Sequence, residues 1–205
     1  MTSRKKSQEP RPRTARDTRV RILEAARHEL SRNPDIPLAH IARVAGAARR
    51  TVYRHFTSRA ALVEGLAEEA GAAIRRAVAD TPDADGSDSV TALARFALTL
   101  WPVGDRYRML IGLAHHGPDA VEVDELLAPA RDTAARILTR GQQQGVFHAS
   151  IPCGPLGRAL EAHMIALLGS VNSGLWADDG VGAATSLLIA AGVEPDVAAW
   201  TICRL

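Results

Sequence analysis

Hydrophobic residues recur at helical spacing along most of the chain. The first stripe has a period near 3.6 residues and predicts a helix from about residue 17 to Asn33, which precedes a proline and therefore avoids the helical region. The stripe consists of Val20, Leu23, Ala26 and Leu30, with Ile22 at its edge. We expect these side chains to form the buried face of the first helix.

Two short helical patterns follow, separated by a glycine. Small and aliphatic residues at positions i, i+3, i+4 and i+7 predict a second helix over residues 38–45. Gly46 tolerates a positive φ, so it is expected to end that helix with a sharp turn. A third helix, from Ala48 to about Arg54, would direct Val52 and Phe56 toward the core and its arginines outward.

The remaining pattern is helical to the end of the chain. Ser58 is a plausible N-cap for a long fourth helix whose apolar residues step by four: Leu62, Leu66, Ala70, Ile74 and Val78. Further helices are expected at about 88–101, 104–116, 119–144, 155–176 and 181–203, with breaks at Pro102, Gly117, Pro118, Gly145, Pro152 and residues 178–180. No alternating strand pattern is present, and the predicted fold class is therefore all-α.

Charge divides the chain into two parts. Residues 1–59 hold 15 Arg and Lys against 5 Asp and Glu, a net charge of +10, whereas residues 60–205 carry a net charge of −8. A basic half this one-sided favours a polyanionic partner over a merely solvated face. Residues 1–15 carry five basic side chains and two prolines, so they predict a disordered arm that is either inert or lies along a minor groove.

The turn and its flanking helices form a helix-turn-helix pattern, and here the sequence resembles the TetR family of bacterial transcriptional regulators. The resemblance covers residues 18–66, through "RILEAARHEL", "IARVAG" and "TVYRHFTSRAALVEGL". It implies a three-helix DNA-binding domain over residues 16–60 and a helical effector-binding and dimerisation domain over residues 61–205. Ala48 stands where the family often has Ser or Thr, which deprives the third helix of a side-chain cap.

The resemblance implies which side chains contact DNA. Thr51 and Tyr53 match positions that touch phosphates, while His55 and Arg59 match basic positions that brace the DNA backbone. The face that reads base edges carries Arg49, Arg50 and Arg54. Because a forked guanidinium can bind guanine O6 and N7 together, Arg49 and Arg50 are the expected determinants of specificity.

The C-terminal part supplies candidates for a homodimer interface and an effector pocket. The resemblance implies a dimer on a pseudo-palindromic operator; the candidate interface is Leu160, Met164, Leu167, Leu168, Val171, Leu187 and Leu188, although these residues could also pack only within the subunit. The candidate effector pocket is Phe96, Leu100, Trp101, Tyr107, Met109, Leu113 and His116, although each could equally be ordinary core.

Other functions have little support in the sequence. His115 and His116 are adjacent, so they point about 100° apart on a helix, and we expect neither a metal site nor a cofactor. No motif of a catalytic nucleophile or phosphate loop is present, and the expected protein is a cytoplasmic regulator, most plausibly a repressor, rather than an enzyme. The alternatives are a DNA-binding protein without an effector, or a helical adaptor or enzyme with a partner other than DNA.

Overall fold

The protein is described by a computed structural model covering residues 15–80, 88–113 and 123–205, and every regular element within these ranges is an α-helix. The predicted basic arm lies outside the described residues, apart from Ala15. The helices are α1 Ala15–Arg32, α2 Leu38–Val44, α3 Arg49–His55, α4 Arg59–Asp80, α5 Ser89–Tyr107, α6 Met109–Leu113, α7 Val123–Gln143, α8 Cys153–Asn172, α9 Val181–Ala190 and α10 Pro195–Cys203. The all-α fold class is confirmed.

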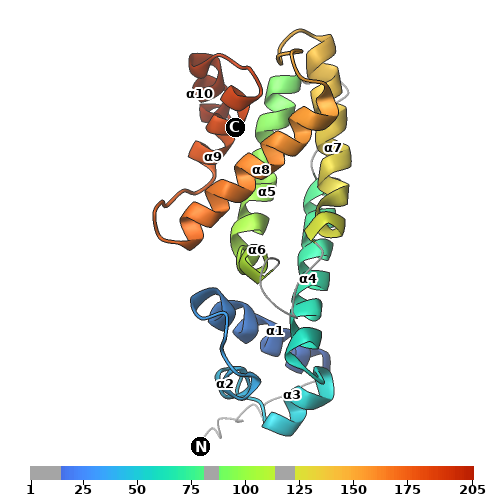
Figure 1. The fold of residues 1–205 in the computed structure, drawn as a ribbon, viewed down its shortest axis with the longest axis vertical. Coiled ribbons are helices and arrows are strands. Elements are labelled where there is room, and N and C mark those ends of the chain that lie inside the picture. The colour runs from blue at the N-terminus through green and yellow to red at the C-terminus, as the bar shows by residue number, and fades with distance from the viewer. Residues whose placement is uncertain (1–14, 81–87, 114–122) are drawn as a thin grey trace, which may run out of the picture.

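The helices form two groups joined by α4. Helices α1, α2 and α3 cluster around the first part of α4, which then continues along α5 and α7; α9 and α10 lie on the far side of α5, and α8 crosses in front of α5 from α7 toward α9 (Figure 1). One core lies under α1–α4 and includes Val52, Phe56 and Leu62; the other joins α5, α7, α8, α9 and α10. Val52 and Phe56 are 0% and 2% exposed, which confirms their predicted orientation.

The buried face of α1 is rotated from the predicted one. Leu23, Ala26 and Leu30 are buried as expected, but Ile22 is completely buried and Val20 is 56% exposed. Ile22 belongs to the core of α1–α4, so the true apolar face is centred nearer Ile22, Ala26 and Leu30. The prediction for Val20 was wrong because Val20 points away from the face that carries Ile22, Ala26 and Leu30.

The turn between α2 and α3 and the start of α4 follow the local sequence signals. Gly46 adopts φ of 59°, which is the left-handed conformation expected of it. The Oγ atom of Ser58 accepts a hydrogen bond of 3.1 Å from the amide of Ala61, so Ser58 caps α4 as predicted. In contrast, the N-cap residue of α3 is Ala48, which makes no side-chain cap hydrogen bond.

Two predicted helix boundaries in the C-terminal part were wrong. Pro102 lies inside α5 instead of ending a helix, because the burial of Trp101 on one side and Tyr107 on the other offsets the one hydrogen bond that proline cannot make. The helix expected over 181–203 is interrupted at Gly192, which has φ of 105°, and α10 begins afresh at Pro195. The proline at N1 is favourable because its missing N–H has no partner within the helix.

Asp88 caps α5, and its removal is expected to destabilise the protein. Its carboxylate accepts 2.9 Å and 2.7 Å hydrogen bonds from the amide and hydroxyl of Thr91. We expect Asp88→Ala to lower the free energy of unfolding by about 1 kcal/mol near neutral pH, as measured by urea denaturation. Asp88→Asn retains the oxygen acceptor and should behave nearly as the native protein does.

The Asp88 cap should also depend on pH in one direction. Partial burial raises the pKa of the Asp88 carboxyl, but the hydrogen bonds from Thr91 outweigh this effect, and the pKa lies below its usual value. Because the pKa is lowered in the folded state, the carboxylate stabilises the fold above the unfolded pKa of about 3.9 and loses this effect as the pH falls. The difference between native protein and Asp88→Ala should therefore shrink below about pH 4; a difference that stays constant there would contradict this role.

Candidate DNA-binding surface and ligand cavity

Helix α3 presents a basic surface away from the core. Arg49, Arg50 and Arg54 are all exposed, and Val52 anchors the opposite face of the helix. The guanidinium carbon of Arg49 lies 5.6 Å from the centre of the Tyr53 ring, and Tyr53 is 39% exposed. A short helix with outward arginines has the size and side chains needed to enter a major groove.

The other predicted DNA-contacting residues on α3 and at the start of α4 are less exposed than the three arginines. Thr51 and His55 are half-buried, and the His55 ring is tilted against Phe56 with 6.5 Å between ring centres. The Arg59 guanidinium donates hydrogen bonds to the carbonyl oxygens of Pro34 and Ile36, the latter at 3.1 Å. Arg59 therefore braces the turn between α1 and α2 in this structure.

Arg21, which the sequence analysis did not single out, holds the turn that positions α3. Its Nη2 donates hydrogen bonds to the carbonyl oxygens of Ala45 and Gly46, the latter at 3.1 Å. These bonds satisfy carbonyls at the end of α2, where the helix itself offers no further donors. Arg21 is one arginine among many in the sequence, and only the crossing of α1 with α2 shows its role.

Gly46 should tolerate no side chain without a loss of stability. An alanine there would adopt an unfavourable left-handed conformation, and its Cβ would lie 3.2 Å from Nη2 of Arg21. We expect Gly46→Ala to lower the free energy of unfolding by about 1–2 kcal/mol in a denaturation experiment. Gly154→Ala is the matched control, because nothing lies within 4 Å of its Cβ position and Gly154 has no positive φ. An equal effect of the two substitutions would contradict the role assigned to the turn.

A cavity of about 480 Å³ lies between α5, α7 and α8, with α4 and α6 also contributing to its wall. Of the predicted pocket residues, Phe96, Leu100, Trp101 and Tyr107 line it. Met109 and Leu113 pack instead in the core of α1–α4, and His116 lies outside the described residues. The sequence analysis missed the walls supplied by α7 and α8, including Leu127, Ala130 and Cys153, because only the fold brings these helices to α5.

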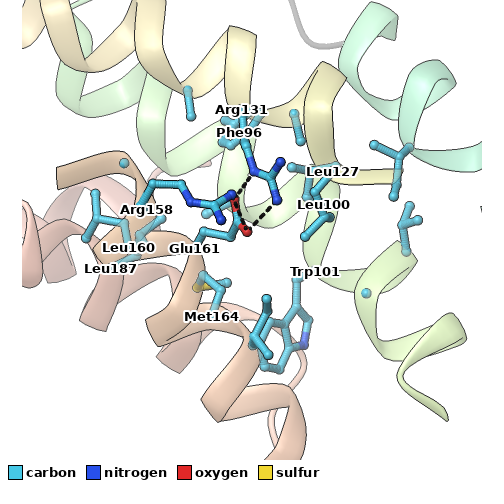
Figure 2. Close-up of a pocket in the computed structure, with 18 of the residues that line it drawn as sticks. Phe96, Leu100, Trp101, Leu127, Arg131, Arg158, Leu160, Glu161, Met164 and Leu187 are labelled. Atoms are coloured by element: carbon cyan, nitrogen blue, oxygen red, sulfur yellow. Dashed lines mark hydrogen bonds and ion pairs between the residues drawn. The ribbon is translucent and has the colours of Figure 1, made fainter. Parts of the chain in front are cut away.

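One wall of the cavity carries a closed ring of four charged side chains, called here the ion-pair ring: Asp124 and Arg131 from α7, and Arg158 and Glu161 from α8. Arg131 contacts Glu161 through Nε at 2.5 Å and Nη2 at 2.9 Å, and Asp124 Oδ1 at 2.9 Å. Arg158 contacts Asp124 at 3.1 Å and Glu161 at 3.4 Å. Figure 2 shows Arg131 and Arg158 converging on Glu161 beside apolar side chains.

The ion-pair ring favours the charged forms of Asp124 and Arg131. Hydrogen bonds from Arg158 and Arg131 lower the pKa of the Asp124 carboxyl, and the hydrogen bond with Glu161 raises the pKa of Arg131. The Arg131 and Glu161 side chains are 22% and 19% exposed, whereas Asp124 is 73% exposed. The ring thus extends from solvent to the cavity wall, with Arg131 and Glu161 on its inner side.

The cavity also shares residues with the core of the DNA-binding end. Tyr107 and Leu110 line the cavity and belong to the core cluster formed by α1–α4. The guanidinium carbon of Arg27, on α1, lies 5.9 Å from the centre of the Tyr107 ring. Burial and the nearby Glu69 carboxylate raise the pKa of the Tyr107 hydroxyl. The cavity wall at α5 and α6 therefore shares side chains with the core that packs against α1.

The predicted interface residues divide between interior and surface. Leu160, Leu168, Leu187 and Leu188 are buried within the subunit, and Met164 lines the cavity with three of them. Leu167 and Val171 are half-buried and pack near Trp101. The outward faces of the same two helices carry other residues: Ala159, Ala166 and Gly169 on α8, and Val181 and Ile189 on α9.

Within residues 15–80, 88–113 and 123–205, no three His, Cys, Asp or Glu side chains are grouped so as to hold a metal ion. The helices of the same ranges include none that is both long and apolar enough to cross a bilayer.

These features define a helix-turn-helix protein with a ligand-sized cavity in its second helical part. Residues 22–66 match the family described as bacterial regulatory proteins, tetR family. This match identifies a tetR-family DNA-binding segment at residues 22–66, and the chain has the fold of solved TetR-family transcriptional regulators, which are not enzymes. Regulators of this family bind DNA and small molecules, typically as dimers.

Solved structures of such regulators resemble the whole chain. PfmR from Thermus thermophilus is 19% identical over 84% of this chain and 98% of its own, with a TM-score of 0.68. LfrR from Mycobacterium smegmatis in complex with proflavine is 25% identical over 86% and 98%, with a TM-score of 0.63. RolR in complex with resorcinol is 19% identical over 93% and 95%, with a TM-score of 0.53. No curated protein matches the chain in a sequence comparison.

Proposed function

We propose that this protein is a homodimeric repressor that binds a pseudo-palindromic operator and is released from it by a small-molecule effector. The observation that carries the proposal is the pairing of an arginine-bearing α3 with a cavity whose wall is shared with the core beneath α1. DNA binding belongs to residues 16–60, and effector binding and dimerisation belong to residues 61–205. A function in operator binding places the protein in the cytoplasm.

DNA recognition rests on α3 and the turn before it. Arg49, Arg50 and Arg54 would read base edges, with Arg50 and Arg54 directed outward and Arg49 beside Tyr53. Thr51, Tyr53 and His55 would contact phosphates, which position a protein on DNA without reading sequence. Because one seven-residue helix reads only a few bases, selectivity requires two copies about one helical turn apart.

The outward faces of α8 and α9 would form the dimer interface. Ala159, Ala166 and Gly169 are small and exposed, which allows a second helix to approach closely, and Ile189 is 42% exposed on α9. His163 and Ser186 lie 3.0 Å apart and hold the two helices together within the subunit. An isologous pairing of these faces gives a closed four-helix contact.

Release would follow from the shared wall of the cavity. An effector that binds best when Tyr107 and Leu110 are displaced would favour an arrangement of α1 and α4 in which the two α3 helices no longer match successive grooves. The complexes of LfrR with proflavine and RolR with resorcinol support a small molecule as the signal. A DNA-binding protein without an effector would have a filled core in place of the cavity. The cavity therefore favours a regulator with an effector over this alternative.

The test is fluorescence-anisotropy binding to DNA selected from a random pool and to a scrambled version, at several salt concentrations. We expect the selected DNA to bind at least about a thousandfold more tightly. The logarithm of the binding constant should fall by about 0.9 per phosphate contact for each logarithmic unit of salt. Equal binding of both DNAs would reject the proposal in favour of a helical protein whose partner is not DNA.

A further inference from the structure

We infer that the cavity selects effectors by charge: it takes a neutral, largely apolar molecule and rejects anions and cations of the same shape, because the ion-pair ring is already charge-balanced. This inference rests on the proposed function of the cavity as an effector site. It names the chemical class of the effector.

The cavity wall is mainly apolar. Its lining is apolar except for the polar groups of Trp101, Tyr107 and Cys153 and four charged residues, Arg131, Asp132, Arg158 and Glu161. Asp132 is exposed, so water solvates its carboxylate and weakens its field inside the cavity. The other three belong to the ion-pair ring, whose fourth member, Asp124, lies at the solvent side.

The members of the ion-pair ring bond to one another, and their charges balance. Every nitrogen of the Arg131 guanidinium already donates to a protein oxygen: Nε to Glu161, Nη1 to the Asp124 carbonyl at 2.7 Å, and Nη2 to both carboxylates. Glu161 in turn accepts from Arg131 and Arg158. Two guanidinium groups and two carboxylates sum to zero charge, so the ring offers neither an anion nor a cation an uncompensated opposite charge.

Neutral and charged ligands of the same shape differ in the free energy they gain or lose on entering the cavity. A neutral ligand gains from burying its apolar surface against Leu100, Trp101 and Met164, and needs nothing from the ring. A carboxylate or ammonium of equal length must give up its hydration, and a ring of zero net charge compensates this loss poorly. The cavity volume of about 480 Å³ suits a molecule of drug-like size or smaller.

The experiment measures binding of three probes with one chain length, decan-1-ol, decanoate and decylammonium, to the full chain at pH 7 by isothermal titration calorimetry. A change in tryptophan emission that is lost in Trp101→Phe locates each probe in the cavity, since Trp101 is buried in its wall. We expect decanol to bind at least about tenfold more tightly than either ion, a difference of about 1.4 kcal/mol. A charged probe that equals or exceeds decanol, or a failure of decanol to bind, would overturn the inference.

Two charge variants make the test specific to the ion-pair ring. Glu161→Gln leaves the ring with a net positive charge and should shift the preference toward decanoate by at least about tenfold. Arg131→Gln leaves it with a net negative charge and should shift the preference toward decylammonium. Opposite shifts cannot arise from general loosening of the fold, which would affect the three probes alike. Shifts in the same direction, or none in two folded variants, would contradict the inference.

Glu125→Gln is the matched control, because Glu125 is an exposed carboxylate on α7 that does not line the cavity. It should leave the order of the three probes unchanged. The calorimetry contains no DNA, and the operator experiment contains no probe. Loss of charge selectivity with intact operator binding therefore rejects only this inference, whereas loss of operator selectivity rejects the proposed function.

Discussion

Phe56→Ala is expected to lower the free energy of unfolding by about 3–5 kcal/mol, the largest stability effect of the changes considered. Phe56 is 2% exposed and lies in the core cluster shared by α1–α4. A Cβ atom on Gly65 would come within 2.8 Å of its ring, and the guanidinium carbon of Arg19 lies 5.3 Å from the ring centre. Removal of the ring leaves a cavity under α3, so urea denaturation should show a reduced midpoint.

Tyr53→Ala is the control that separates core from surface. Tyr53 is on the same helix but is 39% exposed, so its truncation should change the unfolding free energy by no more than about 0.5 kcal/mol. Its effect should appear instead in DNA binding, if the ring contacts a phosphate. Comparable stability losses in the two variants would contradict the assignment of Phe56 to the core and Tyr53 to the surface.

Arg50→Ala should cause the largest loss of operator affinity. Arg50 is exposed on α3 and is free of the ring contact that Arg49 makes with Tyr53. A bidentate arginine contact with guanine contributes about 1–3 kcal/mol, and a dimer loses two such contacts, roughly 2–6 kcal/mol in all. Anisotropy titrations should therefore show a loss of at least about thirtyfold on selected DNA.

The losses of affinity on selected and on scrambled DNA distinguish a base contact from a phosphate contact at Arg50. Removal of a residue that reads bases should weaken binding to the selected DNA much more than binding to the scrambled DNA. Arg76→Ala removes the same charge from an exposed position late in α4, far along the chain from α3, and should change neither affinity by more than a few-fold. Equal losses on both DNAs for Arg50→Ala would make Arg50 a phosphate contact.

Local signals were sufficient for the helix-turn-helix. Gly46 predicts the turn, Ser58 the cap of α4, and Val52 and Phe56 the inner face of α3, and each of these predictions is confirmed. The turn and the cap rest on interactions between residues close in sequence, whereas the inner face of α3 follows from the spacing of its apolar residues. The same segment matches the tetR family, and the DNA-contacting roles of its arginines stay a prediction.

Predictions failed where packing between distant segments competes with local preference. Pro102 is a helix breaker by its chemistry, yet α5 passes through it because buried residues on both sides hold the helix. Val20 fits the apolar period of α1 but finds no core to pack against and is exposed. The spacing of apolar residues predicts that a helix forms, whereas the helices packed against it determine which of its faces is buried.

The sequence by itself determined the fold class, the DNA-binding segment and its basic character, and the presence of aromatic residues suited to a pocket on α5. Only the tertiary structure decided that Phe96, Leu100, Trp101 and Tyr107 line a cavity while Met109 and Leu113 fill another core. It also decided that Arg131 meets Glu161, thirty residues away, across two helices. The physical reason is that a cavity and a ring of charges exist only between elements, so their formation depends on how helices cross and not on the residues of any one helix.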